Sequence, residues 1–386
     1  MKIMGRPADA SEYYQLLFGV PAQLIEDANP GLGEGVSSRG GLVIPGYTVR
    51  RTASQSMMEA AAANQLSLDA LLAVNEGKKE AGIYIPERIR EPVIMTKKPY
   101  EYEHLISDLK ALKEFYPFLK IKAIGKSVMK REIFEVRLGR GPKVIHYNGA
   151  FHANEWITSA ILMKWLNELL LSMANSTPLC GLRSMPFYDD VTISIVPMVN
   201  PDGVELVHKG ETAAQGKFDV AAMNNGSGEY LAWKSNIRGV DLNNQFPAGW
   251  DIEKLRNVPQ APSFRDYPGD RFLTEPEAVA MWKLAKESSF DKVIALHTQG
   301  KEFYWGYESK EPHYSYCIAS EFERKSPYRA VKYIDSHGGY KDWFIQEFRL
   351  PGFTLELGFG INPLPLSQME EIYRDTLGIL MAGLYM

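Results

Sequence analysis

The sequence of 386 residues has little cysteine and no long apolar run. Its two cysteines, Cys180 and Cys317, lie far apart, so they cannot form a disulfide framework, and we expect both to be reduced. No stretch reaches the ~18 apolar residues that a membrane-spanning helix needs. The first residues, MKIMGRPADASEYY, lack the apolar core of a secretion signal. These absences predict a cytoplasmic protein with no membrane segment.

The chain also lacks an excess of charge of one sign. Its net charge is -4 and it contains no basic run, so we expect no nucleic-acid partner. The composition, 45% hydrophobic and 23% charged, is that of a soluble globular protein. Because single cores usually stop growing near ~250 to 300 residues, the length predicts a large domain together with something smaller.

An imperfect repeat occupies the first 90 residues. Residues 18–31 and 64–77 align without gaps, with Asn29 opposite Asn75. Each copy is followed by a short strand ending in Ile-Pro, at 41–45 and 82–86. A repeat of this kind predicts two small modules, at residues 1–46 and 47–90.

The remainder, residues 91–386, has the alternating texture of an α/β domain, after a linker marked by Pro92 and the segment TKKPY. Helices are expected at 103–117 and 156–173, and buried strands at 143–149, 191–200, 292–297 and 352–357. This alternation predicts a mixed, largely parallel sheet with helices on both faces.

His152 and Glu155 lie between a predicted buried strand and a predicted helix. The spacing places both side chains on one face of a first helical turn, and zinc accepts imidazole nitrogen and carboxylate oxygen. Spacing alone is weak evidence, because His208 and Glu211 share it. His208 lies in a polar segment, whereas His152 follows a strand at the edge where open α/β sheets place their ligands. We therefore predict a metal site at His152 and Glu155.

Two later residues complete a candidate hydrolytic site. His297 ends the apolar segment KVIALH and is a candidate third ligand, although a core histidine at a strand end would look the same. Glu356 lies within the apolar segment GFTLEL. A buried carboxylate is costly unless it is paired or functional, so Glu356 is a candidate general base, with an unexplained strand glutamate as the alternative.

These four positions, in this order, resemble the zinc metallocarboxypeptidase family. The segments NPDGVE (200–205), RGVDLNNQFPAGW (238–250), IGKSVMKREIFEVRLG (124–139) and TEPEAVAM (274–281) resemble further motifs of that family. The resemblance covers residues 97–386 and implies a carboxypeptidase-like fold. It also implies one zinc ion per chain, held by His152, Glu155 and His297, with Glu356 as the base.

The same resemblance assigns further residues. Lys234 stands where the family has its oxyanion-stabilising arginine, and Asn243 keeps the substrate-binding asparagine. Tyr333 matches the mobile tyrosine, with Tyr340 as a competitor. Asn244 replaces the arginine that binds the substrate's terminal carboxylate. A neutral amide cannot replace a bidentate arginine, which argues against ordinary carboxypeptidase specificity.

The front repeats resemble LysM modules, which have a βααβ fold and bind N-acetylglucosamine-containing glycans. A spacer or a homodimerisation element is the alternative. LysM modules joined to a domain without the arginine clamp resemble the bacterial γ-D-glutamyl-meso-diaminopimelate endopeptidases. That resemblance implies peptidoglycan stem peptides or muropeptides as substrates, reached inside the cell or through sporulation or lysis. Arg265 and Arg271 are candidates for binding the substrate's carboxylates.

Two other functions remain open from the sequence. One is a zinc carboxypeptidase that acts on a different peptide C-terminus. The other is a peptidoglycan- or chitin-binding protein with a degenerate catalytic domain, which the complete set of ligands and base argues against.

Overall fold

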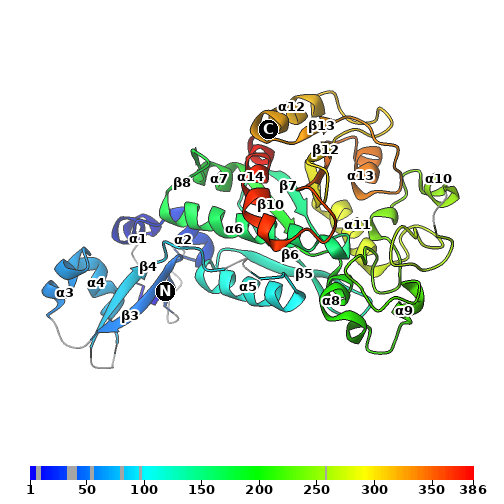
Figure 1. Cartoon of the computed structure of the whole chain (residues 1–386). Coiled ribbons are helices and arrows are strands. Elements are labelled where there is room, and N and C mark those ends of the chain that lie inside the picture. Colours follow the sequence, from blue (N-terminus) through cyan, green and yellow to red (C-terminus); the bar gives the residue numbers. More distant parts are fainter. Residues whose placement is uncertain (6–9, 33–40, 53–55, 79–81, 95–97, 257–258) are drawn as a thin grey trace. The chain divides into compact units, whose positions relative to one another are not determined.

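The computed structural model describes residues 1–5, 10–32, 41–52, 56–78, 82–94, 98–256 and 259–386 (Figure 1). The chain forms two compact units. The first comprises Met1–Met95, Asp108–Lys120 and Leu166–Pro186, and the second comprises Thr96–Ser107, Ile121–Trp165 and Phe187–Met386. The first unit thus includes segments beyond the two predicted modules. The predicted linker lies partly outside the described residues, at 95–97.

The first unit contains two successive βααβ motifs. In the first motif, two short antiparallel strands enclose two helices: β1 (Lys2–Ile3), α1 (Ser11–Phe18), α2 (Ala22–Ala28) and β2 (Leu42–Val43). The second repeats this order with longer antiparallel strands: β3 (Tyr47–Thr52), α3 (Met57–Ala63), α4 (Leu68–Asn75) and β4 (Ile83–Arg88). Each motif ends in the strand predicted from the repeat, and the βααβ order is the one that the LysM resemblance implied.

The aligned asparagines make the same contacts in both motifs. The amide of Asn29 donates to the carbonyls of Ile25 and Val43, and its oxygen accepts from the Val43 amide, each at 2.7 Å. Asn75 bonds in the same way to Leu71 and Tyr84. One side chain thus ties the end of the second helix to the last strand in each motif, which explains why the repeat keeps asparagine there.

An eight-stranded mixed sheet forms the centre of the second unit, in the order β13-β12-β14-β11-β7-β10-β6-β5. Four central strands, β10, β7, β11 and β14, run parallel. β6 and β12 pair antiparallel to their inner neighbours, while β12 and β13 are parallel. The strands are β5 (Lys120–Lys126), β6 (Glu132–Leu138), β7 (Lys143–Asn148), β10 (Val191–Val196), β11 (Lys292–His297), β12 (Glu302–Tyr304), β13 (Arg329–Val331) and β14 (Gly352–Glu356).

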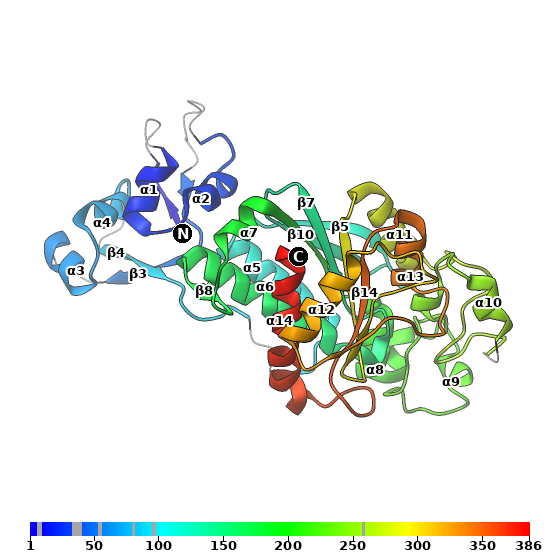
Figure 2. The same ribbon diagram turned by 90° about the horizontal axis from the view of Figure 1, so that it is seen from above.

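Helices cover both faces of this sheet (Figures 1 and 2). On one face, Val293 belongs to a core cluster with α11 (Pro276–Ser288) and α13 (Tyr340–Phe348). On the other face, the Tyr147 ring packs 4.7 Å from Trp165 of α6 (Ile157–Asn175), and its hydroxyl donates to a carbonyl of α14 (Met369–Tyr385). The predicted mixed, largely parallel sheet between helical layers is confirmed.

The remaining helices and strands complete the described chain. They are α5 (Tyr102–Phe115), η1 (Ala153–Glu155), β8 (Pro178–Leu179), β9 (Leu182–Arg183), α7 (Met185–Asp190), α8 (Pro201–Lys209), η2 (Gly210–Ala214), α9 (Val220–Met223), η3 (Leu242–Asn244), α10 (Trp250–Leu255), α12 (Ser315–Lys325) and η4 (Leu366–Gln368). Neither cysteine forms a disulfide, and both are exposed, as expected. Across the described ranges, no helix combines the length and the apolar character needed to cross a bilayer.

Candidate metal centre and active site

The candidate residues meet at the carboxyl ends of three neighbouring parallel strands. His297 is the last residue of β11 and is paired in register with Glu356, the last residue of β14. β7 lies on the other side of β11 and ends at Asn148, four residues before His152. The expectation that these residues share one edge of the sheet is confirmed, since parallel strands bring their carboxyl ends together.

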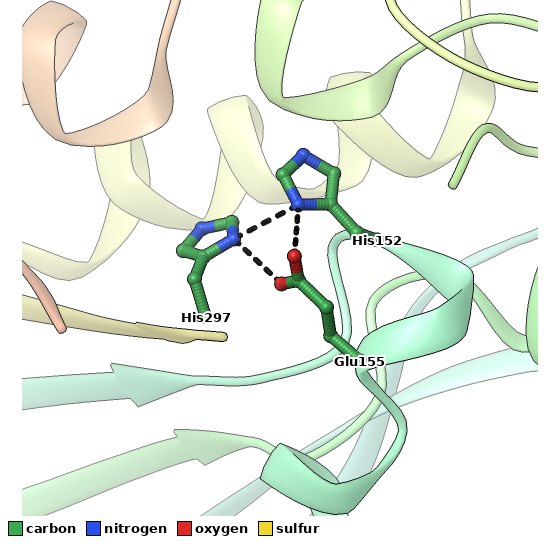
Figure 3. Close-up of side chains that lie close together, drawn as sticks. All are labelled: His152, Glu155 and His297. Carbon is green, nitrogen blue, oxygen red and sulfur yellow. Dashed lines mark hydrogen bonds and ion pairs between the residues drawn. The ribbon is translucent and has the colours of Figure 1, made fainter. Parts of the chain in front are cut away.

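His152, Glu155 and His297 form a tight cluster of buried ligand atoms (Figure 3). The Nδ1 atom of His152 lies 2.9 Å from Glu155 Oε1, and His297 Nδ1 lies 3.0 Å from Glu155 Oε2. The two Nδ1 atoms are 3.1 Å apart. Glu155 ends the short 3-10 helix η1 and precedes α6, so the His-Glu pair lies in a 3-10 turn and not in the predicted α-helical turn.

The donor set fits zinc. A tetrahedral ion bonded ~2.1 Å from each ligand holds neighbouring ligand atoms ~3.4 Å apart. The two imidazole nitrogens are 3.1 Å apart, each lies 2.9 or 3.0 Å from one oxygen of Glu155, and one ligand atom from each residue lies within 4.8 Å of the others. Two imidazoles and one carboxylate also match the three-ligand pattern of catalytic zinc sites, which keep a further position for water or substrate.

Asp241 supports the cluster from behind His152. Its Oδ1 lies 3.3 Å from His152 Nε2, the ring nitrogen that does not face the other ligands. A carboxylate in this position fixes the tautomer and orientation of a ligating imidazole. Asp241 is fully buried, next to the 3-10 helix η3. No role in orienting His152 was assigned to Asp241 from the sequence. An acidic residue between apolar neighbours was the signal that could have indicated it.

The carboxylates and imidazoles shift one another's pKa values. Burial alone would lower the pKa of His152, but Glu155 and Asp241 raise it to about 9. Burial opposes ionisation of Glu155, yet the two histidines lower its pKa to about 2. Burial and the nearby Glu155 carboxylate raise the pKa of Glu356 well above its usual range. The cluster therefore favours an ionised Glu155 beside a Glu356 that holds a proton readily.

Lys234 lies beside the cluster with its ammonium between two carboxylates. Its Nζ is 2.7 Å from Asp241 Oδ2 and 2.9 Å from Asp266 Oδ1. Burial disfavours the charged form, but these two carboxylates raise the pKa of Lys234 well above its usual value. The Lys234 carbonyl accepts a 3.0 Å bond from the Ala153 amide, which joins its segment to the metal loop. Lys234 is therefore a fixed cation at the site.

The metal loop is also held by the start of α8. The Asn200 amide donates to the carbonyls of Phe151, at 3.2 Å, and Ser235, at 3.0 Å, so one side chain bridges the loops carrying His152 and Lys234. A Cβ on Gly203 would lie 2.7 Å from the Ala153 Cβ. The close approach requires glycine, which gives the NPDG segment a structural reason.

A pocket of about 460 Å³ opens onto the cluster. Its lining includes His152, Glu155, Lys234, Arg265, Tyr304 and Glu356. Residues 302–307, EFYWGY, form an aromatic segment. Its Tyr304 lines the pocket, while Phe303 and Tyr307 are buried in the core. The structure thus places two of the proposed ligands, His152 and Glu155, together with the proposed base and oxyanion cation around one space.

Other residues named from the sequence lie off this lining. Asn243 accepts a bond from the Tyr340 amide, and Asn244 lies 3.5 Å from the His337 carbonyl. Arg271 is exposed and does not line the pocket. The Tyr333 hydroxyl donates to Glu311 at 2.9 Å, away from the metal cluster, and Ile334 lines the pocket instead.

Tyr340 and His208, the alternative candidates from the sequence, both pack against other aromatic side chains. Tyr340 is fully buried and its ring lies 5.5 Å from Phe151, which makes it a core residue. His208 lies in the last turn of α8, with its ring 5.1 Å from the Trp156 ring. Among the described residues, the one group that could hold a metal ion is the His152 cluster, so His208 is not part of such a group, as expected.

Asn362 is a further pocket residue that sequence reasoning missed. Its amide donates to the Thr298 carbonyl at 3.0 Å, and its oxygen accepts from the Thr298 hydroxyl at 2.8 Å. The same amide lies 3.4 Å from Glu155 Oε1. Asn362 therefore links the residue after one ligand to the carboxylate of another.

Comparisons with known proteins agree with this site. The family model described as zinc carboxypeptidase matches residues 105–378. The chain is 44% identical over 397 residues to a protein named gamma-D-glutamyl-L-diamino acid endopeptidase 1 from Lysinibacillus sphaericus, and the alignment covers 100% of both chains. 

Solved structures share the fold at low sequence identity. Thrombin activatable fibrinolysis inhibitor aligns with a TM-score of 0.60 and 17% identity, over 75% of this chain and 74% of that one. Carboxypeptidase A from Helicoverpa armigera aligns with a TM-score of 0.56 and 17% identity, over 88% of this chain and 97% of that one. Together with the family match and the His-Glu-His cluster, these findings show that the chain belongs to the zinc carboxypeptidase family.

Proposed function

We propose that this zinc peptidase hydrolyses the amide bond between γ-linked D-glutamate and the L-centre of meso-diaminopimelate in peptidoglycan stem peptides. The observation that carries the proposal is the buried His152-Glu155-His297 cluster with Glu356 at the same sheet edge. The name of the full-length relative supplies the bond type. Asn244, a neutral residue off the pocket lining, supports a specificity other than that of an ordinary carboxypeptidase.

The chain's own residues account for the steps of such a hydrolysis. His152, Glu155 and His297 would hold zinc, which supplies activation of water and polarisation of the scissile carbonyl. Glu356, which lines the pocket at the end of β14, would accept the proton of the attacking water and return it to the departing amine. Lys234 Nζ donates to Asp266 Oδ1 and forms an ion pair with Asp241 Oδ2, and its other N–H groups can serve the developing oxyanion.

Peptide hydrolysis tests the proposal directly. Incubation of the zinc-loaded protein with L-Ala-γ-D-Glu-meso-diaminopimelate is expected to give L-Ala-D-Glu and free diaminopimelate, measured by mass spectrometry. The lysine analogue reports the diamino-acid preference. A peptide with an ordinary α-linked C-terminal residue is the control. Cleavage of that control alone would replace the proposal with a conventional exopeptidase.

We also propose that the two βααβ motifs are LysM modules that bind N-acetylglucosamine-containing glycan. Their shared element order and their matching Asn29 and Asn75 contacts support two copies of one module. The full chain carrying Glu356→Gln is expected to sediment with insoluble glycan strands stripped of stem peptides. Chitin oligosaccharides are expected to compete. Intact peptidoglycan is tested beside the stripped strands. If the chain sedimented with neither sample, the motifs would be assigned a spacer role.

A further inference from the structure

We infer that Arg265 binds the α-carboxylate of the γ-linked glutamyl residue, and that Asp266 positions its guanidinium for this contact. The inference rests on the proposed function and adds the residue that selects the acyl side of the substrate. A γ-linked glutamyl unit carries a free α-carboxylate that three carbons separate from the scissile carbonyl, whereas a residue without an acidic side chain carries no carboxylate there. A cation at that distance would therefore select a glutamyl residue on the acyl side.

The pocket offers few cations for this task. In the part of the chain that the structure describes, the lysine and arginine side chains on its lining are Lys234 and Arg265. Arg271, the other arginine of the same segment, is exposed and off the lining. The choice of a carboxylate-binding residue in the pocket is thus between two side chains.

Lys234 and Arg265 differ in how many carboxylates already neutralise them. The Lys234 ammonium is matched by two carboxylates, at 2.7 and 2.9 Å, so a third carboxylate would add negative charge around one cation. Arg265 uses only Nε, 2.8 Å from Asp266 Oδ2. Its two terminal nitrogens form no hydrogen bond or ion pair with a described residue, and they can bind a carboxylate bidentately.

Backbone bonds hold the segment that carries Arg265 beside the segment that carries Lys234. The Phe264 carbonyl accepts bonds from the amides of Lys234, at 2.8 Å, and Ser235, at 3.0 Å, so the two segments run side by side. The Asp266 carboxylate then bridges Lys234 Nζ and Arg265 Nε with its two oxygens. One carboxylate group therefore separates the oxyanion cation from the guanidinium.

The position of Arg265 assigns it to the acyl side. A substrate carbonyl directed at Lys234 would bring the carboxylates on both sides of the scissile bond near Arg265, so nearness alone does not choose between them. Arg265 belongs to the segment beside Lys234, whereas the family's clamp for the leaving residue corresponds to Asn244. Asn244, the neutral residue at the position that resembles the family's C-terminal clamp, lies off the lining. The leaving diamino acid therefore has no arginine at that position.

The test uses three peptides and the full zinc-loaded protein. The first is L-Ala-γ-D-Glu-meso-diaminopimelate, the second has the glutamyl α-carboxylate replaced by a carboxamide, and the third has the L-centre carboxylate of diaminopimelate replaced instead. The wild-type kcat/KM is expected to fall roughly 10- to 100-fold from the first peptide to the second, the range of a charge-assisted bond. Arg265→Gln is expected to bring this ratio close to one by slowing only the first peptide.

Matched variants separate this role from a structural one. Arg271→Gln, from the same segment, is expected to keep the wild-type ratio, and Arg265→Lys to keep part of it. Zinc content checks that each variant retains its site. An unchanged ratio in Arg265→Gln would overturn the inference, as would a loss of discrimination against the third peptide in place of the second.

A binding measurement keeps the inference distinct from the proposed function. Calorimetry on the Glu356→Gln chain is expected to show tighter binding of the first peptide than of the second, and Arg265→Gln in that background is expected to remove the difference. If the wild type cleaved none of the peptides, the proposed function would fail by itself. Equal binding of the first two peptides would refute the role of Arg265 whether or not turnover occurs.

Discussion

Glu356→Gln is expected to retain zinc and to lose hydrolysis almost completely. The glutamine keeps the size of the side chain but can neither accept the proton of the attacking water nor return it to the leaving amine. General acid-base catalysis contributes roughly 100- to 10,000-fold, so kcat is expected to fall by about that factor. Turnover of the γ-linked peptide and zinc content by mass spectrometry measure the two properties separately.

A neighbouring carboxylate provides the matched control. Glu302 is paired across the sheet with Glu356 in the register of β12 and β14, but it does not line the pocket. Its carboxylate is bonded to Arg329. Glu302→Gln is therefore expected to keep most of the turnover. If Glu356→Gln were as active as Glu302→Gln, Glu356 could not be the base.

His297→Ala is expected to lose zinc and, with it, activity. Mutation of an outer-shell partner costs ~10- to 100-fold in metal affinity, and loss of a ligand should exceed that. In the wild type, zinc at 100 times its dissociation constant should raise the free energy of unfolding by ~2.7 kcal/mol. The melting temperature with and without zinc therefore reports binding independently of activity.

Two further variants serve as controls for the loss of zinc in His297→Ala. His208→Ala removes a histidine from the other His-x-x-Glu pair, packed against Trp156, and is expected to keep stoichiometric zinc. His297→Asn retains a polar side chain at a position that is 1% exposed, in case alanine disturbs folding. Full zinc occupancy in a folded His297 variant would refute the ligand assignment.

The asparagines of the repeat show how far local sequence can predict structure. Asn29 and Asn75 were matched by alignment, and each ties a helix end to a strand through short-range bonds. The order of strands and helices in the second unit was also predictable, because apolar periodicity depends on neighbouring residues. The eight-stranded order was not, because strand pairing joins segments far apart in the chain.

The residues of the site also fall into two groups, those that the sequence predicted and those that only the structure revealed. Residue type, spacing and position after apolar strands made His152, Glu155, His297 and Glu356 candidates, and the family resemblance joined them into one predicted site. Asp241 and Asn362 were missed because their roles depend on which side chains lie beside them, 3.3 Å from His152 in one case and 3.4 Å from Glu155 in the other. No local pattern carries that information.

The two arginines of the segment SFRDYPGDRF illustrate the limit most clearly. They were equal candidates in the sequence, since both are cations in one polar loop. The tertiary structure places Arg265 on the pocket lining beside Asp266 and leaves Arg271 off it. The sequence alone selected the candidate metal ligands, the candidate base and the family resemblance, because those depend on residue chemistry and order. Only the tertiary structure decided which charges face the substrate, because that depends on which distant segments pack together.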